Sequence, residues 1–139
     1  YKDALRKHKV QVRKKNICEI PFDDIYNQVG EAIKKLLAKP NPVTALYAVN
    51  NSIAKACLEH ITEMNLRVPE DIALLSYDDI DVFKFCTPPV TAVAQPLHEI
   101  GDQAVDILLE MIKNNGKVKQ ANRQVILPAK IVKRKSSGK

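Results

Sequence analysis

Aromatic residues, cysteine and glycine are all scarce in this sequence. Aromatic side chains make up 5% of the 139 residues and there is no tryptophan. The three cysteines, Cys18, Cys57 and Cys86, are odd in number and widely spaced, so they form neither a disulfide framework nor a metal-binding pattern. Their apolar neighbours predict buried thiols in a reducing cytoplasm. The four glycines form no phosphate-binding loop, and there is no nucleophile elbow.

The sequence also has no long hydrophobic run. No apolar stretch approaches the roughly 18–20 residues needed to span a bilayer. The first residues, Tyr-Lys-Asp-Ala-Leu, are helical in character rather than those of a secretory signal. We therefore expect a cytoplasmic protein with no membrane contact.

Positive charge is present in excess but gathers at the two ends. The formal net charge is +6, and the basic residues concentrate in residues 2–15 and 133–139, while the middle of the chain is mixed or mildly acidic. A nucleic-acid surface would interleave basic and aromatic residues or carry a reading helix. Solvated chain ends explain this distribution better than direct DNA contact.

Candidate catalytic groups are isolated from one another. Asp78 and Asp79 are adjacent at the end of a predicted strand, so their side chains should point in opposite directions. The three histidines fall on different elements, and His60 and His98 are expected to be solvated. Two further carboxylates, in residues 23–24, fit the N-terminal charge of a helix. We predict that the chain is not an enzyme and holds no metal or cofactor.

Hydrophobic periodicity predicts alternating strands and helices. Strands are expected at 16–20, 43–49, 72–77, 90–94, 124–127 and 129–132, and 43–49 has the unbroken apolar composition of a strand buried on both faces. Helices are expected at 1–9, at 26–37, over the apolar stripe 53–64, and from 97 to a C-terminal cap near 114–116. This order predicts an α/β fold with a mostly parallel sheet.

Polar residues follow two of the predicted strands. Asn50 and Asn51 lie where strand 43–49 meets its helix, and Asp78 and Asp79 follow strand 72–77. Open α/β sheets bind ligands outside the carboxyl ends of their strands. Carboxylate and amide groups there predict a cleft for a small polar molecule that presents hydroxyl or amide groups, as sugars and nucleobases do.

Four ordered blocks carry a family resemblance. They are Pro-Val-Thr-Ala-Leu-Tyr-Ala-Val-Asn-Asn at 42–51, Val-Pro-Glu-Asp-Ile with Ser-Tyr-Asp-Asp at 68–79, Pro-Pro-Val-Thr with Gln-Pro at 88–96, and Leu-Pro-Ala-Lys-Ile-Val-Lys-Arg at 127–134. Together they resemble the lactose/galactose (LacI/GalR) and purine repressor family of transcriptional regulators. Ser76, Asn51 and Ala92 depart from the family pattern, which leaves the fold intact but the effector undefined.

The resemblance implies a two-lobed core of the type I periplasmic-binding-protein kind. Residues 1–94 would form the C-terminal lobe, 95–127 a crossover helix and strand of the other lobe, and 128–139 a final strand and basic tail. Helix 97–113 and strand 124–127 would pack on that other lobe, leaving an exposed apolar stripe in this chain. The helix-turn-helix that binds operator DNA in the family is absent from this sequence.

The resemblance also assigns site residues. The effector, a sugar, sugar phosphate or purine, would contact Asp78, Asn50, Gln95 and an apolar wall at Phe22 or Ile25. A homodimer face would include Ser52, Lys55, Phe83 and Phe85.

Structural alternatives remain beside these roles. Asn50 could serve only as a helix cap, and Asp78 only as a turn residue. For the whole protein, the alternative is a periplasmic sugar-binding protein, which shares the two-lobed core. The unpaired cysteines and the repressor-like blocks count against it.

Overall fold

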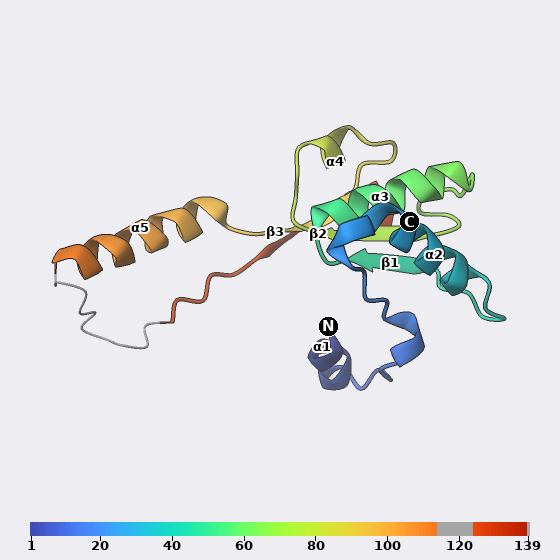
Figure 1. Cartoon of the computed structure of the whole chain (residues 1–139), viewed down its shortest axis with the longest axis horizontal. Helices are drawn as coiled ribbons and strands as arrows, with labels where there is room; N and C mark the ends of the chain where they lie inside the picture. The colour runs from blue at the N-terminus through green and yellow to red at the C-terminus, as the bar shows by residue number, and fades with distance from the viewer. Residues whose placement is uncertain (114–123, 139) are drawn as a thin grey trace.

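The computed structural model describes residues 1–113 and 124–138. Within them, a sheet has the strand order β1 (Ala45–Ala48), β2 (Ala73–Tyr77), β3 (Thr91–Ala94) and β4 (Lys130–Val132). β1, β2 and β3 run parallel, and β4 is antiparallel to β3 (Figure 1). The predicted α/β class with a mainly parallel sheet is confirmed.

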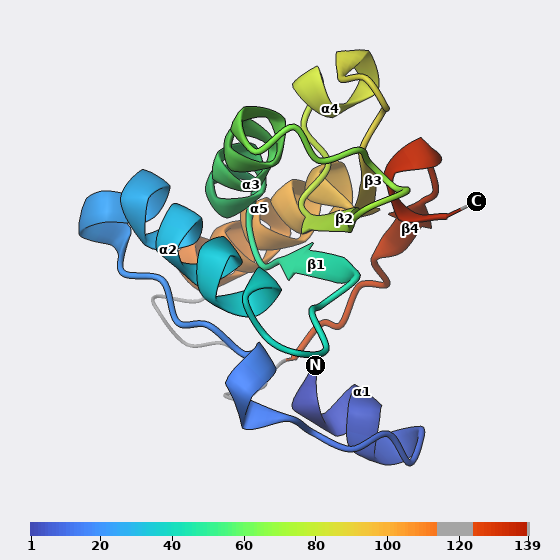
Figure 2. The same cartoon turned by 90° about the vertical axis from the view of Figure 1, so that its right-hand side faces the viewer.

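The chain also forms five α-helices in its described part. They are α1 (Lys2–Lys7), α2 (Ile25–Leu37), α3 (Asn51–Glu63), α4 (Val82–Phe85) and α5 (Leu97–Lys113). α2 packs against α3, which lies over β1 and β2, while α1 lies on the side of β1 that is away from β2 (Figure 2). The predicted helices are confirmed, although the expected end at 114–116 lies outside the described residues.

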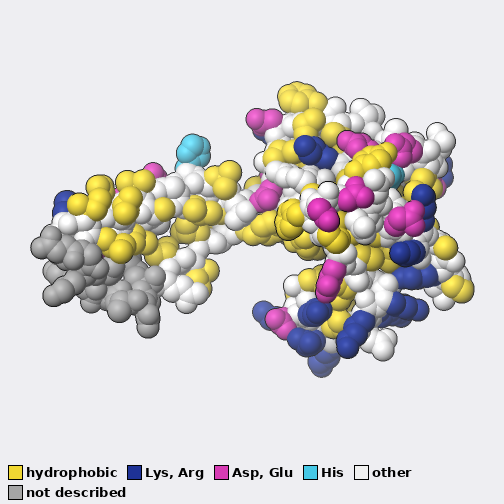
Figure 3. Space-filling view, in the orientation of Figure 1, with side chains coloured by type: hydrophobic (Ala, Val, Ile, Leu, Met, Phe, Trp, Pro, Cys, Tyr) yellow, Lys and Arg dark blue, Asp and Glu magenta, His cyan; other side chains and the backbone are white. Residues whose placement is uncertain are grey.

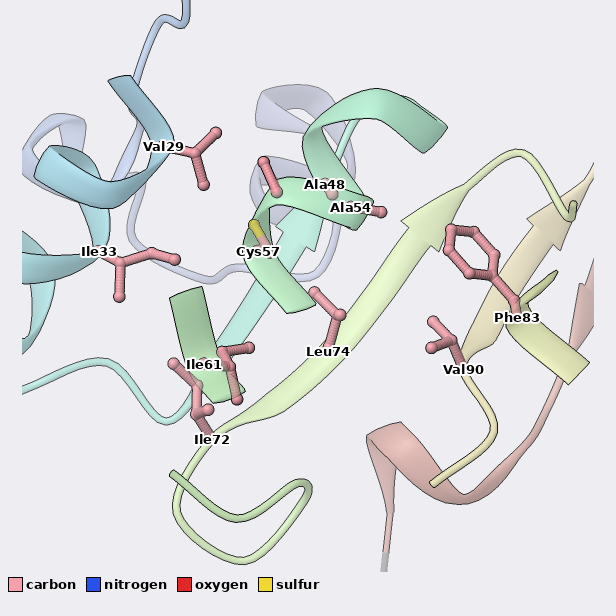
Figure 4. Packing of buried hydrophobic residues seen from close by; sticks show 11 residues of the cluster. Val29, Ile33, Ala48, Ala54, Cys57, Ile61, Ile72, Leu74, Phe83 and Val90 are labelled. Carbon is pink, nitrogen blue, oxygen red and sulfur yellow. The ribbon is translucent and has the colours of Figure 1, made fainter. Parts of the chain in front are cut away.

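The hydrophobic core lies between the sheet and these helices (Figure 4). Alternation along the strands sends Ala48 and Leu74 towards α2 and α3, which contribute Ile33 and Ile61. Phe83 of α4 and Val90 extend the core beside β3. Such a core fixes the strand ends, where the polar residues lie.

β1 is not buried on both faces as its composition predicts. It is the first strand of the described sheet, and its Ala45 and Tyr47 are exposed. The Tyr1 ring covers part of this face, with its centroid 6.5 Å from that of Tyr47. The prediction is wrong for this face because neither a full helical layer nor another described strand lies against it.

Two predicted strands do not form. Residues 16–20 contain the end of a 3-10 turn (Lys14–Asn16) and irregular chain, and 124–127 is irregular chain as well. Both have strand-like composition, but neither pairs with a strand in the described part of the molecule. The other strands form with shorter bounds than predicted.

α5 and residues 124–129 form an arm that projects from the carboxyl ends of the parallel strands (Figure 1). No residue of α5 is buried. All of its apolar side chains except that of Ile107 are exposed, as expected, and apolar side chains gather over the arm in Figure 3.

His60 is not solvated as predicted. It is 8% exposed, and its Nε2 lies 2.9 Å from the Tyr26 carbonyl oxygen while Nδ1 lies 3.0 Å from Glu63 Oε2. The ring packs against Gly30. A polar residue on the α3 face that meets α2 is buried because both of its nitrogens have partners there.

The cysteine prediction holds for one thiol. Cys57 is buried in the core, and desolvation raises its thiol pKa to about 12. Cys18 is exposed and Cys86 half-buried. Cys18 lies in the irregular segment before α2, so its apolar neighbours do not build a core around it.

Candidate functional site

The register of the sheet aligns the polar residues predicted to bind a ligand. Ala48 of β1 pairs with Ser76 of β2, so Asn50 and Asp78 each lie two residues beyond this pair. Gln95 follows β3, the next strand along. The three side chains therefore belong to the carboxyl edge of three adjacent parallel strands, where α/β sheets bind ligands.

Asp78 and Gln95 are in direct contact. Gln95 Nε2 donates a hydrogen bond of 2.6 Å to Asp78 Oδ1, and both residues are half-buried. Asp78 has a φ of 72°, the left-handed region that Asp tolerates better than most side chains. Its backbone N–H continues the ladder by donating to the Val93 carbonyl at 3.0 Å. The turn thus places a carboxylate beside an amide at the start of the arm.

Asp79 faces away from this pair. Arg134 Nη1 and Nη2 donate to its two carboxylate oxygens at 2.7 and 2.8 Å, and both side chains are 13% exposed. This bidentate pairing raises the pKa of the Arg134 guanidinium. The expectation that adjacent aspartates point apart is confirmed, and Asp79 has a structural partner.

Asn50 caps α3. Its Oδ1 accepts the Ile53 N–H at 2.8 Å, as favoured N-cap residues do. The cap occupies the side-chain oxygen, so a ligand-binding role for Asn50 depends on its amide nitrogen.

Phe22 lies in a 3-10 turn, Phe22–Asp24, directly before α2. The first residues of α2 lie at the end of the sheet where the arm departs (Figure 1). The ring is 81% exposed, whereas Ile25 packs partly against the core. Of the two, Phe22 has the free apolar surface that a ligand wall requires.

The predicted dimer residues divide into two groups. Ser52 and Lys55 are exposed on α3, and Phe85 is 81% exposed on α4. Phe83 is 0% exposed, so its assignment to a dimer face is wrong. On the short helix α4 the two rings point in different directions, and only Phe83 enters the core.

A cavity of about 840 Å³ opens elsewhere, along the edge of β1. Apolar side chains from both faces of the strand line it, including Ala45, Leu46, Tyr47 and Ala48. Asn50, Asp78 and Gln95 do not. A strand edge flanked by apolar side chains does not offer the convergent polar groups that a polar metabolite needs.

Other kinds of site are not indicated in residues 1–113 and 124–138. They hold no cluster of three or more His, Cys, Asp or Glu able to bind a metal. Their helices include none that is long and apolar enough to cross a membrane.

Arg134 was missed by the site prediction. The sequence signal was the fourth family-like block, 127–134, which ends on this residue. Charge clustering at the end of the chain suggested a solvated tail, yet Arg134 is held by an acid 55 residues earlier.

Comparison with protein families identifies the group to which this core belongs. Residues 1–137 match the model of the periplasmic binding protein-like domain. The chain belongs to the periplasmic binding protein-like family. Its curated relatives are repressors: the ribose operon repressor of Haemophilus influenzae is 34% identical over 114 residues (82% of this chain and 34% of the relative), and the repressor PurR of the same species is 40% identical over 106 residues (75% and 31%).

Solved structures agree with this placement. A LacI-family regulator from Sanguibacter keddieii matches the whole chain and 52% of its own length, with 27% identity and a TM-score of 0.85. A LacI-family regulator from Enterococcus faecalis with bound ribose matches 81% of this chain and 40% of its own, with 27% identity and a TM-score of 0.69. The resemblance to the lactose/galactose and purine repressors is confirmed.

This chain of the periplasmic binding protein-like family spans about a third of the length of its curated relatives. Because those relatives are repressors, the comparisons do not favour the alternative of a periplasmic sugar-binding protein.

Proposed function

We propose that this chain is the effector-sensing and dimerisation part of a DNA-binding transcriptional repressor. The observation that carries the proposal is the Asp78–Gln95 pair at the carboxyl edge of the sheet, 2.6 Å apart between Oδ1 and Nε2. Asp78 directly follows β2, and Gln95 lies between β3 and α5, the helix of the arm. A ligand held there would touch both the body of the chain and the arm.

The chemistry of the edge favours a hydroxyl-rich ligand. The Asp78 carboxylate accepts hydrogen bonds from hydroxyl groups, the Gln95 amide can donate and accept, and the Asn50 amide nitrogen can donate. Phe22 supplies an exposed ring against which an apolar ligand face can pack. A sugar is our first candidate, supported by the ribose operon repressor and the ribose-bound neighbour. A purine is the second, supported by the similarity to PurR.

Signalling would depend on two lobes. In the proposed assignment residues 1–94 form one lobe, residues 95–127 belong to the other, and residues 128–139 return to the first. An effector that binds one arrangement of the lobes more tightly shifts the population towards it. The shift changes operator affinity only as far as the effector discriminates between the arrangements.

The proposed partners follow from the relatives. The name of the PurR relative specifies a helix-turn-helix repressor, so we assign operator binding to a domain outside this chain. We propose a cytoplasmic homodimer with no catalytic role, joined through a face that includes Ser52, Lys55 and Phe85.

Calorimetric titration of the full-length protein tests this function. Ribose, other sugars, sugar phosphates and purines are titrated into the wild type, into Asp78→Ala, and into Asp81→Ala as a control whose side chain is 88% exposed. We expect one ligand class to bind the wild type and the control, and binding to Asp78→Ala to fall at least tenfold with unchanged folding. Undiminished binding to Asp78→Ala would place the effector elsewhere.

A further inference from the structure

The C-terminal segment is built into the sheet rather than solvated. Ser136 is 0% exposed, and its Oγ donates to the Leu74 carbonyl at 2.6 Å and accepts from the Thr91 N–H at 2.8 Å. The Ser136 N–H donates to the Pro89 carbonyl at 3.1 Å. One side chain therefore bridges β2 and β3, the two strands that carry Asp78 and Gln95 at their ends.

Arg134 is fixed in backbone and side chain. Its N–H donates to Thr91 Oγ1 at 2.9 Å, and that hydroxyl donates to the Arg134 carbonyl at 3.0 Å. Besides binding both oxygens of Asp79, Nη1 donates to the Val90 carbonyl at 2.6 Å. A guanidinium held at three acceptors with 13% exposure is preorganised rather than freely rotating.

The turn at 78–79 is consequently held from two sides. Arg134 binds the carboxylate of Asp79, and Gln95 binds the carboxylate of the preceding residue, which has a φ of 72°. A left-handed non-glycine residue persists when its surroundings determine its conformation. Because the two aspartates are consecutive, fixing one carboxylate restricts where the other can point.

We infer that Arg134 is a positioning residue for the effector site: by holding Asp79, it orients Asp78 towards Gln95 and the ligand. The inference rests on the proposed function only in treating Asp78 as an effector contact. In this role Arg134 acts through Asp79 and does not itself contact the ligand. Since it follows β4 by two residues and β4 is joined to the arm, it also connects the arm to the turn.

The Gln95 side-chain amide offers a readout that needs no ligand. Full-length protein is labelled with ¹⁵N at glutamine side chains, and the Gln95 signals are assigned by their loss in Gln95→Met. In the wild type we expect one Nε2 proton to be shifted downfield and protected from exchange by its bond to Asp78. In Arg134→Lys, which keeps the charge but loses the bidentate geometry, we expect the shift and the protection to be lost. Lys135→Gln, next in sequence, is the matched control and should resemble the wild type.

A merely structural Arg134 would lower the melting temperature but leave the Gln95 signals of the folded protein unchanged, and that result overturns the inference. Should Arg134→Lys fail to fold, Asp79→Asn removes the charge and one of the two acceptor oxygens without changing side-chain size, and its Gln95 signals decide in the same way. The ribose and purine titrations are then repeated with the folded variant. Loss of the Gln95 signature with no ligand bound by the wild type supports the positioning role and contradicts the proposed function. If the Gln95 signals of the variant are unchanged and the wild type binds a ligand, the positioning role is contradicted and the proposed function is supported.

Discussion

At the scale of single residues, Gly30 and His60 are fitted to each other. A Cβ added at Gly30 would lie 2.7 Å from the His60 ring atoms Cε1 and Nε2. The ring cannot withdraw without losing its hydrogen bonds to Tyr26 and Glu63. The absence of a side chain at position 30 therefore allows α2 and α3 to approach closely around a buried polar residue.

Gly30→Ala should destabilise the protein. Overpacking a well-packed site typically costs about 1–3 kcal/mol, which exceeds the gain of about 1 kcal/mol from replacing a helical glycine by alanine. Urea unfolding measures the difference. Gly101→Ala is the control, because its added Cβ meets nothing within 4 Å in helix α5, and it should be neutral or stabilising. Equal effects of the two substitutions would contradict a specific Gly30–His60 fit.

Arg67 and Asp71 form a pair with a defined pH dependence. Asp71 accepts hydrogen bonds from the Arg67 side chain and backbone at 2.7 to 2.9 Å, which lower its carboxyl pKa to about 2. A pKa depressed in the folded state means that the pair stabilises the fold above the ordinary aspartate value near 4. That stability is lost as the pH falls towards the folded-state value.

Arg67→Gln should therefore lower the free energy of unfolding at pH 6 by an amount that shrinks as the pH falls from about 4 to about 2. Denaturant unfolding of both proteins across this range measures it. A deficit that stays constant down to pH 2 would show that Arg67 stabilises the fold by some means other than its ion pair.

Residue identity alone predicted some of these environments and missed others. The opposed directions of Asp78 and Asp79 followed from strand geometry, which is local. The burial of His60 depends on a glycine 30 residues earlier, and the burial of Phe83 depends on how α4 docks beside Val90. The same is true of Arg134, whose partner is distant in the chain. Contacts between remote segments have no local signal in a single sequence.

At the scale of elements, the start of α3 has two proposed roles that substitution separates. Asn50→Ala removes the N-cap and should cost about 1 kcal/mol of stability, whereas Asn50→Ser retains a capping oxygen. If the Asn50 amide also binds the effector, Asn50→Ser should keep its melting temperature but lose ligand affinity about tenfold. Thermal unfolding and calorimetry measure the two effects, and unchanged affinity would leave Asn50 as a cap only.

α4 carries the most exposed ring of the proposed dimer face. Phe85→Ser should raise the dimer dissociation constant of the full-length protein at least tenfold, because burial of an aromatic side chain contributes strongly at interfaces. Sedimentation equilibrium measures the constant. Phe22→Ser is the matched control, since both rings are 81% exposed and only Phe85 is assigned to the interface. If the dimer dissociation constant rises equally in both variants, or rises in neither, the assignment of Phe85 to the interface is contradicted.

Element type was easier to predict than element surroundings. Amphipathic periodicity located α2, α3 and α5, and apolar runs bounded by turns located β1, β2 and β3. Composition could not show that β1 would have an exposed face, nor that 16–20 and 124–127 would lack a partner strand. A strand requires hydrogen bonds from a neighbour, and its own sequence does not specify that neighbour.

At the scale of the whole molecule, apolar surface is unevenly distributed. The arm exposes Leu97, Val105, Leu108 and Ile112 at 54% or more, and the edge of β1 is open as well. Contiguous exposed apolar surface in a soluble protein marks an interaction site. The 139-residue chain on its own should therefore self-associate through the arm.

Replacing Leu108 and Ile112 together by lysine should convert these associated species to monomers, because two charges cannot be buried in an apolar contact without a large desolvation cost. Sedimentation velocity at several concentrations measures the change. The control replaces Lys2 and Lys7 by glutamine, which alters exposed polar positions on α1. In the full-length protein the lysine pair should instead lower the melting temperature, since we assign this helix to the contact with the other lobe. A 139-residue chain that is already monomeric at high concentration would show that the arm folds back on its own chain, and would remove the main support for a second-lobe assignment of residues 95–127.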